Sequence, residues 1–121
     1  MNINTSHKGW TKEKLCRDEL KKEGYTIIFQ SVRTRWATYD FADLFDVVAV
    51  TDKNPIWKFI SVKHLTKGNY YLPHQEEIRE FKRKYGLEHM DFELWLWDKP
   101  RWKGRKPNKI WHKGDWKKIL I

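Results

Sequence analysis

Two short apolar segments separated by a turn constrain most strongly what this chain can fold into. Residues 44–50 (LFDVVAV) and 57–63 (WKFISVK) are rich in branched and aromatic side chains, which favour β-strands. The intervening residues 51–55 (TDKNP) are of the types that stop a strand and reverse the chain. The pattern therefore predicts an antiparallel hairpin over residues 44–63.

The register of this hairpin brings an acid close to a lysine. If the turn is centred near residues 53–54, Asp46 lies opposite Ser61, and the two-residue strand period puts Lys63 on the same face. Metal-dependent cleavage of a phosphodiester uses such a pair, because the acid binds the cation and the lysine steadies the attacking water or the developing charge. From the hairpin alone, a solvent-facing Asp–Lys pair worth at most about 1 kcal/mol is the simpler interpretation.

Size and charge narrow the classes of function. The 121 residues predict one domain over residues 1–121. Lys and Arg outnumber Asp and Glu by 25 to 16, and the net charge of +9 favours polyanions, with nucleic acid first among them. We expect a soluble, cytoplasmic protein without a membrane partner, because no apolar run approaches the roughly 20 residues of a span and the polar start is no signal peptide. The lone Cys16 and the spacing of the histidines indicate neither a disulfide nor a zinc site.

The remaining periodicities predict an α/β fold with a mixed central sheet flanked by helices. A first helix is expected from Thr11 to Gly24, with an apolar stripe of Leu15, Cys16 and Leu20. The other expected elements are a strand over 25–32, a loop over 33–40, the hairpin, a helix after Pro73 that ends at Gly86, a strand over 91–97, and a closing hairpin of residues 109–111 with 116–121. The order is an αβββαβ core followed by a C-terminal β hairpin.

Four short motifs follow one another at characteristic spacings. Lys8-Gly9 is followed four residues on by Glu13, Gly24-Tyr25 ends the expected first helix, and the hairpin contributes residues 44–49 and 60–63. In order and spacing these motifs resemble the PD-(D/E)XK nuclease superfamily, and archaeal Holliday junction resolvase-like nucleases most of all. The resemblance spans about residues 8–97 and implies a restriction-endonuclease-like domain.

The resemblance also implies an activity and a set of site residues. It implies a DNA endonuclease, selective for branched or flapped DNA structures, that uses Mg²⁺ or Mn²⁺ and often acts as a homodimer. Asp46 and Glu13 would bind the metal, Val62 would add its backbone carbonyl, and Lys63 would be the catalytic lysine. Ser61 stands at the position that is usually a Glu or Asp in this superfamily.

The serine leaves three interpretations open, because hard divalent cations favour charged oxygen ligands. The metal site could be completed by waters and substrate phosphates, a nearby Gln75 or Glu76 could supply the missing ligand, or the protein could bind nucleic acid without cleaving it. A basic protein that holds an acidic partner is a further alternative.

The first helix offers two candidate acids. On a helical wheel Glu19 falls within the apolar stripe and Glu13 toward its edge, so periodicity favours Glu19 as the inward-facing residue. The spacing of the resemblance favours Glu13, which we take as the site acid, with Glu19 in reserve.

Several basic residues are candidates for contacts to the DNA backbone. Arginine suits phosphate through its forked donors, and lysine acts as a point charge. The candidates are Arg33 and Arg35 before the hairpin, Lys67 after it, and Arg79 and Lys82 on the second helix. Ser31 could also donate to a phosphate, and residues 99–106 (KPRWKGRK) mix cations with an aromatic, which suits backbone attraction plus stacking or a solvated turn.

Overall fold

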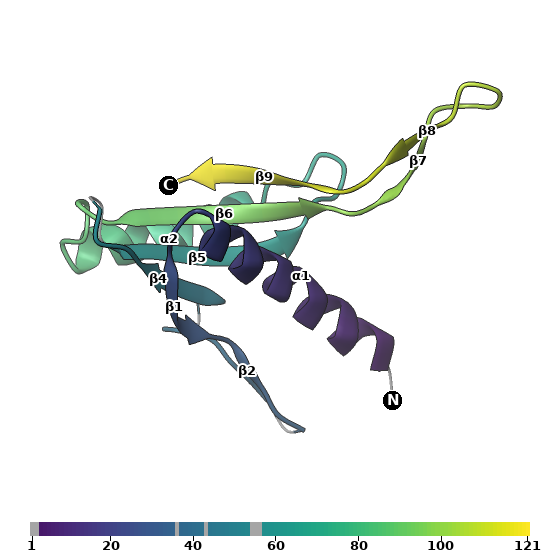
Figure 1. Cartoon of the computed structure of the whole chain (residues 1–121). Coiled ribbons are helices and arrows are strands. Elements are labelled where there is room, and N and C mark those ends of the chain that lie inside the picture. Colours follow the sequence, from purple (N-terminus) through teal and green to yellow (C-terminus); the bar gives the residue numbers. More distant parts are fainter. Residues whose placement is uncertain (1–2, 36, 43, 54–56) are drawn as a thin grey trace.

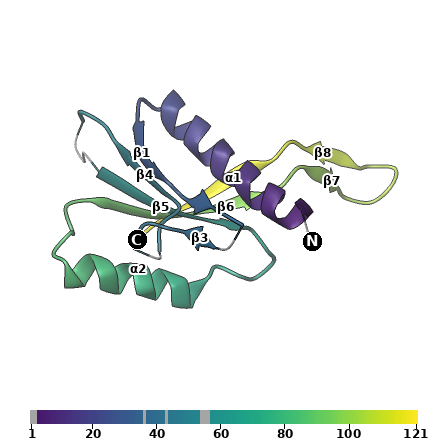
Figure 2. The ribbon, with the colours of Figure 1, turned by 90° about the horizontal axis from the view of Figure 1, so that it is seen from below.

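A five-stranded mixed sheet forms the centre of the fold, with one helix on each face (Figure 1, Figure 2). The computed structural model describes residues 3–35, 37–42, 44–53 and 57–121, with residues 3–10, 33 and 38 described by backbone alone. The sheet order is β1-β4-β5-β6-β9, in which β5 and β6 are parallel and the other neighbours antiparallel. The elements of this layer are α1 (Ile3–Lys22), β1 (Thr26–Gln30), β4 (Val47–Val50), β5 (Trp57–His64), α2 (Leu72–Lys84), β6 (Asp91–Asp98) and β9 (Asp115–Leu120).

The predicted hairpin register is confirmed. Val47 pairs with Ile60 and Val50 with Trp57, so the residue before β4, Asp46, faces Ser61 along the same register. The strand is shorter than expected, because regular pairing begins at Val47 rather than at residue 44. Asp46 therefore lies at the point where the ladder starts.

Both faces of the central strand β5 are buried, and each packs against a different helix. Ile60 and Val62 pack with Cys16 and Leu20 of α1, together with Trp95. On the opposite face, Phe59 packs in the cluster that contains Ile78 of α2; its other buried members are Phe45, Val48 and Phe92. This burial on both faces is the physical reason why Phe59, Ile60 and Val62 are apolar although they are close neighbours in one strand.

Helix α1 differs from the prediction in its start and in its buried stripe. It begins at Ile3 rather than at Thr11, since Gly9 weakens a helix without ending it. From Thr11 onward, where its side chains are described, its buried residues are Glu13, Cys16 and Leu20, whereas Leu15 is 36% exposed. Among the residues that the structure describes, neither helix is long and apolar enough to cross a membrane.

The first strand also ends earlier than expected. β1 stops at Gln30, and the segment predicted to be a loop forms a small hairpin of β2 (Val32–Arg33) and β3 (Thr38–Tyr39). Ser31 lies at the break, where its backbone N–H donates to the carbonyl of Asp46 at 2.8 Å.

The predicted closing hairpin of residues 109–111 with 116–121 is wrong. β8 (Ile110–His112) pairs with β7 (Arg101–Lys103), and β9 pairs along β6. Asp98 faces Asp115 and Arg101 faces His112, so both ladders share one register and form a single long ribbon. This pairing covers the edge of β6 and packs Trp116 against Trp95 and Trp97, with ring centroids 5.2 and 4.8 Å apart.

The outer part of this ribbon, residues 99–114, projects beyond the sheet, and we call it the β-arm (Figure 1, Figure 2). Gly104 lies at its tip and Gly114 at its base, both with positive φ. At Gly114, a Cβ would come within 2.8 Å of the Trp97 ring and 3.2 Å of Pro100. The base of the β-arm therefore requires glycine for space as well as for backbone conformation.

Replacing Gly114 should destabilise the protein more than a change at a glycine of the same conformation. Gly24 has φ +93°, close to the +97° of Gly114, but nothing lies within 4 Å of its added Cβ. We expect Gly24→Ala to lower the free energy of unfolding by about 1 kcal/mol through backbone strain alone, and Gly114→Ala by clearly more, because Trp97 must move. Urea unfolding of both variants measures the difference; equal losses would show that the contact with Trp97 is unimportant.

Candidate active site

The candidate site lies at the end of the sheet where β4 begins and β5 ends. Here the chain bends just before the ladder starts, and the backbone N–H of Asp46 donates to the Ile60 carbonyl at 2.9 Å. The Asp46 carboxylate then accepts the backbone N–H of Val62 through Oδ2 at 2.6 Å. The side chain of Asp46 thus accepts a hydrogen bond from the backbone of β5. This hydrogen bond holds the carboxylate at the end of the sheet.

Val62 presents its backbone to the same place. In an antiparallel strand, the N–H and C=O of one residue point to the same side. Since the Val62 N–H faces Asp46, its carbonyl lies on the β4 side of β5 as well. Its side chain, 3% exposed, packs in the α1 core.

The electrostatic surroundings of Asp46 are unusual for an aspartate. Burial, together with the negative charges of Glu13 and Asp40, raises its pKa to about 7, against the opposing effects of the Val62 hydrogen bond and the Lys63 charge. Glu13, Asp40 and Lys63 are therefore all within electrostatic reach of this carboxyl. Two other residues singled out from the sequence, Glu13 and Lys63, thus act electrostatically on Asp46 at this end of the sheet.

The structure distinguishes the two acids of α1. Glu13 is 2% exposed and lies on the stripe of Cys16 and Leu20, facing the sheet. Burial raises the pKa of the Cys16 thiol, and the charge of Asp46 raises it further, which places that carboxylate close to this face of α1. Glu19 instead approaches Lys118 of β9 at 3.7 Å, so the helical-wheel preference for Glu19 as the inward acid is wrong.

Asp40 and Ser31 join the site, and Asp40 is not among the residues predicted from the sequence. The Ser31 hydroxyl donates to Asp40 Oδ1 at 2.5 Å and lies 3.3 Å from Asp46 Oδ1. Ser31 thus links the two carboxylates. The sequence shows only that Asp40 is an acid in the segment that leads to Asp46. Its place beside Asp46 depends on how the β2–β3 hairpin folds, and no local sequence pattern predicts this.

Ser61 has a partner that the sequence did not reveal. It is 1% exposed, and its Oγ lies 2.7 Å from Nε2 of His74 on α2. Burial and the nearby charge of Lys63 lower the pKa of His74, which keeps its ring neutral near pH 7. Where the resemblance would place a third acid, the structure has a buried serine in contact with a partly buried histidine.

The two residues considered as substitutes for that acid are engaged elsewhere. Glu76 forms an ion pair with Arg79 on the exposed side of α2. Gln75 is buried, and its Nε2 donates to the Tyr70 carbonyl at 2.6 Å.

The donors at the site suit a metal that is shared with a phosphate. Within the described part of the chain, no three His, Cys, Asp or Glu side chains converge to enclose a cation. Mg²⁺ in proteins is commonly held by one or two carboxylates, with waters and substrate phosphates as its other ligands. The carboxylates of Asp46 and Glu13, with the nearby Val62 carbonyl, match that requirement and suit Mn²⁺ equally.

The basic residues predicted to contact DNA fall into two groups. Arg35 and Lys67 are exposed, in the β2–β3 turn and in the turn after β5. On α2, Arg79 pairs with Glu76, and Lys82 donates to the Ile121 carbonyl at 2.9 Å. The side chain of Arg33 lies outside the described residues, as do those of Lys8 and the other residues before Thr11.

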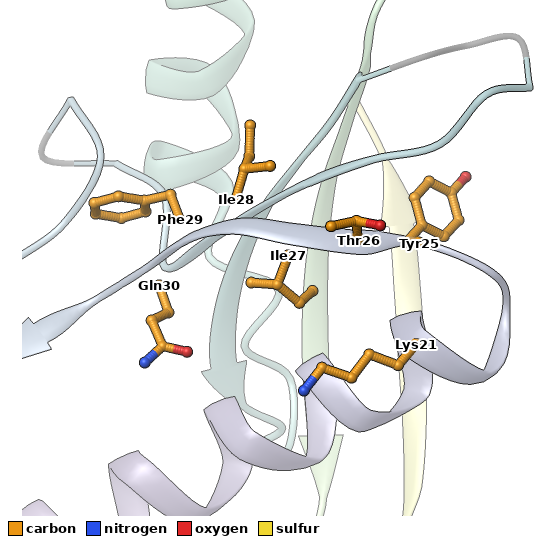
Figure 3. A pocket seen from close by; sticks show the side chains of 7 residues that line it. All are labelled: Lys21, Tyr25, Thr26, Ile27, Ile28, Phe29 and Gln30. Atoms are coloured by element: carbon orange, nitrogen blue, oxygen red, sulfur yellow. The ribbon is translucent and has the colours of Figure 1, made fainter.

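A groove of about 490 Å³ lies away from these residues, between the end of α1 and β1 (Figure 3). Figure 3 shows Ile27 and Gln30 on the side of the strand that faces the helix bearing Lys21, with Ile28 and Phe29 on the other side. Its lining residues are Lys21 and residues 25–30, and they include no acid. The lining of this groove therefore offers no carboxylate to hold a cation.

Comparison with known proteins does not assign the chain to a family. No protein-family model matches it, and no curated protein matches it either.

The raised pKa of Asp46 predicts that stability falls as the pH rises. The carboxyl of Asp46 ionises near pH 3.8 in the unfolded chain and near pH 7 in the folded protein. Between these pH values the folded state binds more protons than the unfolded state, so the free energy of unfolding decreases as the pH rises, and this decrease ends above pH 7. We expect the free energy of unfolding to drop by about 2–4 kcal/mol from pH 4.5 to 8 through this group.

The matched variant is Asp46→Asn, whose amide oxygen can still accept the Val62 N–H. Urea unfolding at both pH values should show a much smaller drop for this variant than for the wild type. Parallel pH dependence in the two proteins would contradict the raised pKa.

Proposed function

We propose that this protein is a metal-dependent DNA endonuclease of the PD-(D/E)XK type, built on a restriction-endonuclease-like domain. The observation that carries the proposal is the Asp46 carboxylate, which is held on the Val62 N–H at the sheet end, near Glu13 and Lys63. A buried carboxyl whose pKa is raised by burial and by a neighbouring acid, with a lysine nearby, is typical of catalytic sites. The order of helices and strands supports the proposal, since α1, β1, β4, β5, α2 and β6 follow the sequence pattern that suggested it.

Asp46 and Glu13 would hold Mg²⁺ or Mn²⁺, with the Val62 carbonyl as a further ligand. When bound, the cation neutralises charge on the phosphate and stabilises the transition state. It would also offset the repulsion between the two carboxylates, which is the main cost of placing them together after burial itself.

Lys63 would orient the attacking water for in-line displacement and offset the developing negative charge. Two features support this role: Lys63 lowers the pKa of both Asp46 and His74, so its charge acts on the centre of the site, and it is only partly buried. His74 stays neutral and holds the Ser61 hydroxyl, which keeps this part of β5 in place beside the lysine.

The proposed substrate is branched or flapped DNA, cut by two subunits that each approach one strand. The net charge of +9 supports binding to the DNA backbone, which needs no sequence recognition. A two-fold pair of sites would suit a substrate with two strands to cleave.

A second candidate is a nucleic-acid-binding protein that keeps this fold without its chemistry. The observation that favours it is the contact of Ser61 with His74, because a hydroxyl engaged with a histidine is a poor replacement for a metal-binding carboxylate. The two candidates differ in whether the protein binds divalent cations at Asp46.

Replacing the proposed catalytic lysine should abolish cleavage without preventing DNA binding. We expect wild-type protein with Mg²⁺ or Mn²⁺ to cut labelled flap or four-way-junction DNA, and Lys63→Ala to lose at least about 100-fold in rate. The matched control is Lys53→Ala, an exposed lysine in the β4–β5 turn at the other end of the hairpin, which should cut at the wild-type rate. Cleavage that survives in Lys63→Ala would overturn the assigned role; salt-sensitive DNA binding without cleavage by either protein would favour the second candidate.

Divalent cations should stabilise the folded protein through the same carboxylates. At pH 8, where Asp46 is ionised, 5 mM Mn²⁺ should raise the melting temperature of the wild type by a few degrees, since a ligand that binds only the folded state stabilises it. Asp46→Asn should show little shift, and an equal shift in both proteins would indicate that the cation binds elsewhere.

A further inference from the structure

The β-arm, residues 99–114, combines strong positive charge with two exposed aromatic planes. It carries seven Lys and Arg residues and no Asp or Glu: Lys99, Arg101, Lys103, Arg105, Lys106, Lys109 and Lys113. It projects from the sheet as a two-stranded ribbon, visible in both ribbon views (Figure 1, Figure 2). A two-stranded projection has no hydrophobic core of its own, so packing does not explain its side chains, and we ask which ligand they suit.

One acid at the base of the β-arm engages part of this charge. Asp98 pairs with Arg101, lies 3.7 Å from Lys103 Nζ, and lies 3.1 Å from His112 Nε2. Burial opposes ionisation of Asp98, but the hydrogen bond from Arg101 and the neighbouring positive charges hold its pKa below the usual value. These contacts join the two strands and fix the orientation of the β-arm where it leaves the sheet.

The other cations of the β-arm have no such partner. In the part of the chain that the structure describes, the remaining five basic residues of the β-arm form no salt bridge. They differ in this from the basic residues of α2, where Arg79 and Arg83 pair with Glu76 and Glu80. The β-arm therefore carries five cations without a salt bridge on one short projection.

Trp102 and Trp111 face each other across the two strands of the β-arm. They are 61% and 52% exposed, and their ring centroids are 5.3 Å apart at an interplanar angle of 64°. Lys109 and Lys113 each lie two residues from Trp111, one on either side along the chain. The other tryptophans of this ribbon, Trp95, Trp97 and Trp116, pack against one another near the sheet.

The β-arm leaves the same end of the sheet as the candidate site. Lys63 pairs with Leu96 of β6, and the chain runs from Leu96 through Asp98 directly into the β-arm. Trp102 is six residues beyond Leu96, which is at most about 20 Å along an extended strand. A stacked single strand would cover that distance in about six nucleotides.

We propose that the β-arm binds a single-stranded segment of DNA, with unpaired bases stacked on Trp102 and Trp111 and phosphates held by the flanking lysines and arginines. Exposed tryptophan planes beside cations are the groups that hold single strands, because every base has a face that can stack. In an intact duplex the base faces are already stacked on one another, so the two tryptophan rings would add little to the affinity for duplex DNA. The inference deepens the proposed function and rests on it for the substrate: the β-arm would hold the unpaired part of a flap or branch while the sheet end meets the strand to be cut.

The test is direct binding in EDTA, where no metal-dependent cleavage occurs. A labelled 20-nucleotide single strand and the matching blunt duplex are titrated with the full chain, and the affinities are compared by fluorescence anisotropy. We expect the single strand to bind more tightly, and the double variant Trp102→Ala/Trp111→Ala to bind it at least about fivefold more weakly while duplex binding changes little. Trp102→Phe/Trp111→Phe should restore most of the affinity, because phenylalanine keeps a stacking face.

Two further variants separate stacking from charge and from folding. Tyr85→Ala, which removes a 56% exposed aromatic at the far end of α2, should leave single-strand affinity unchanged. Lys109→Gln/Lys113→Gln should lower the slope of log affinity against log salt by about 1.4. Thermal unfolding should show that the tryptophan variant stays folded, since the two rings contact each other outside the buried clusters.

The outcomes separate this inference from the proposed nuclease. Unchanged single-strand affinity in the tryptophan variant, or an equal loss with the duplex, overturns the role of the β-arm in binding unpaired bases. If the affinity falls as expected while neither wild type nor Lys63→Ala cuts DNA, the β-arm keeps its role and the nuclease proposal fails.

Discussion

The parallel pairing of β5 with β6 is the constraint on which the rest of the structure depends. A parallel neighbour requires a crossover, and α2 supplies it by covering one face of the sheet while α1 covers the other. The same pairing sets Lys63 beside Leu96, so the end of β5 and the origin of the β-arm lie together. Burial of β5 on both faces then leaves the sheet end as the place where polar groups can gather.

Asp46 illustrates how one residue can serve both the fold and a reaction. Its carboxylate accepts the Val62 N–H, which would otherwise lack the acceptor that a longer β4 would provide. The same position costs stability when the group ionises, because Glu13 and Asp40 are close and burial removes water. Sites that hold like charges together at a cost to stability are frequently functional, and in the proposed function a divalent cation would supply the counter-charge.

The charge of the chain is distributed unevenly in space. On α2, Arg79 and Arg83 pair with acids three residues away, Lys82 donates to a carbonyl and Lys84 lies over the Tyr85 ring, so much of the charge of this helix is engaged locally. The β-arm has seven cations and relies on Asp98 alone at its base, so its field extends into solvent. An overall charge of +9 therefore understates how strongly one projection of the molecule should attract a polyanion.

The sequence by itself determined the α/β class, the β4–β5 register and the nearness of Asp46 to Lys63, because strand periodicity and turn residues are local signals. Helical periodicity did not identify Glu13 as the inward-facing acid, because the predicted apolar stripe included Leu15, which is exposed. Only the resemblance favoured Glu13. Tertiary structure alone decided the partner of Ser61, the approach of Asp40, and the pairing of β9 with β6. Each of these depends on segments far apart in the chain, and their contacts are selected by burial and by the need of a sheet edge for a partner, which no local pattern encodes.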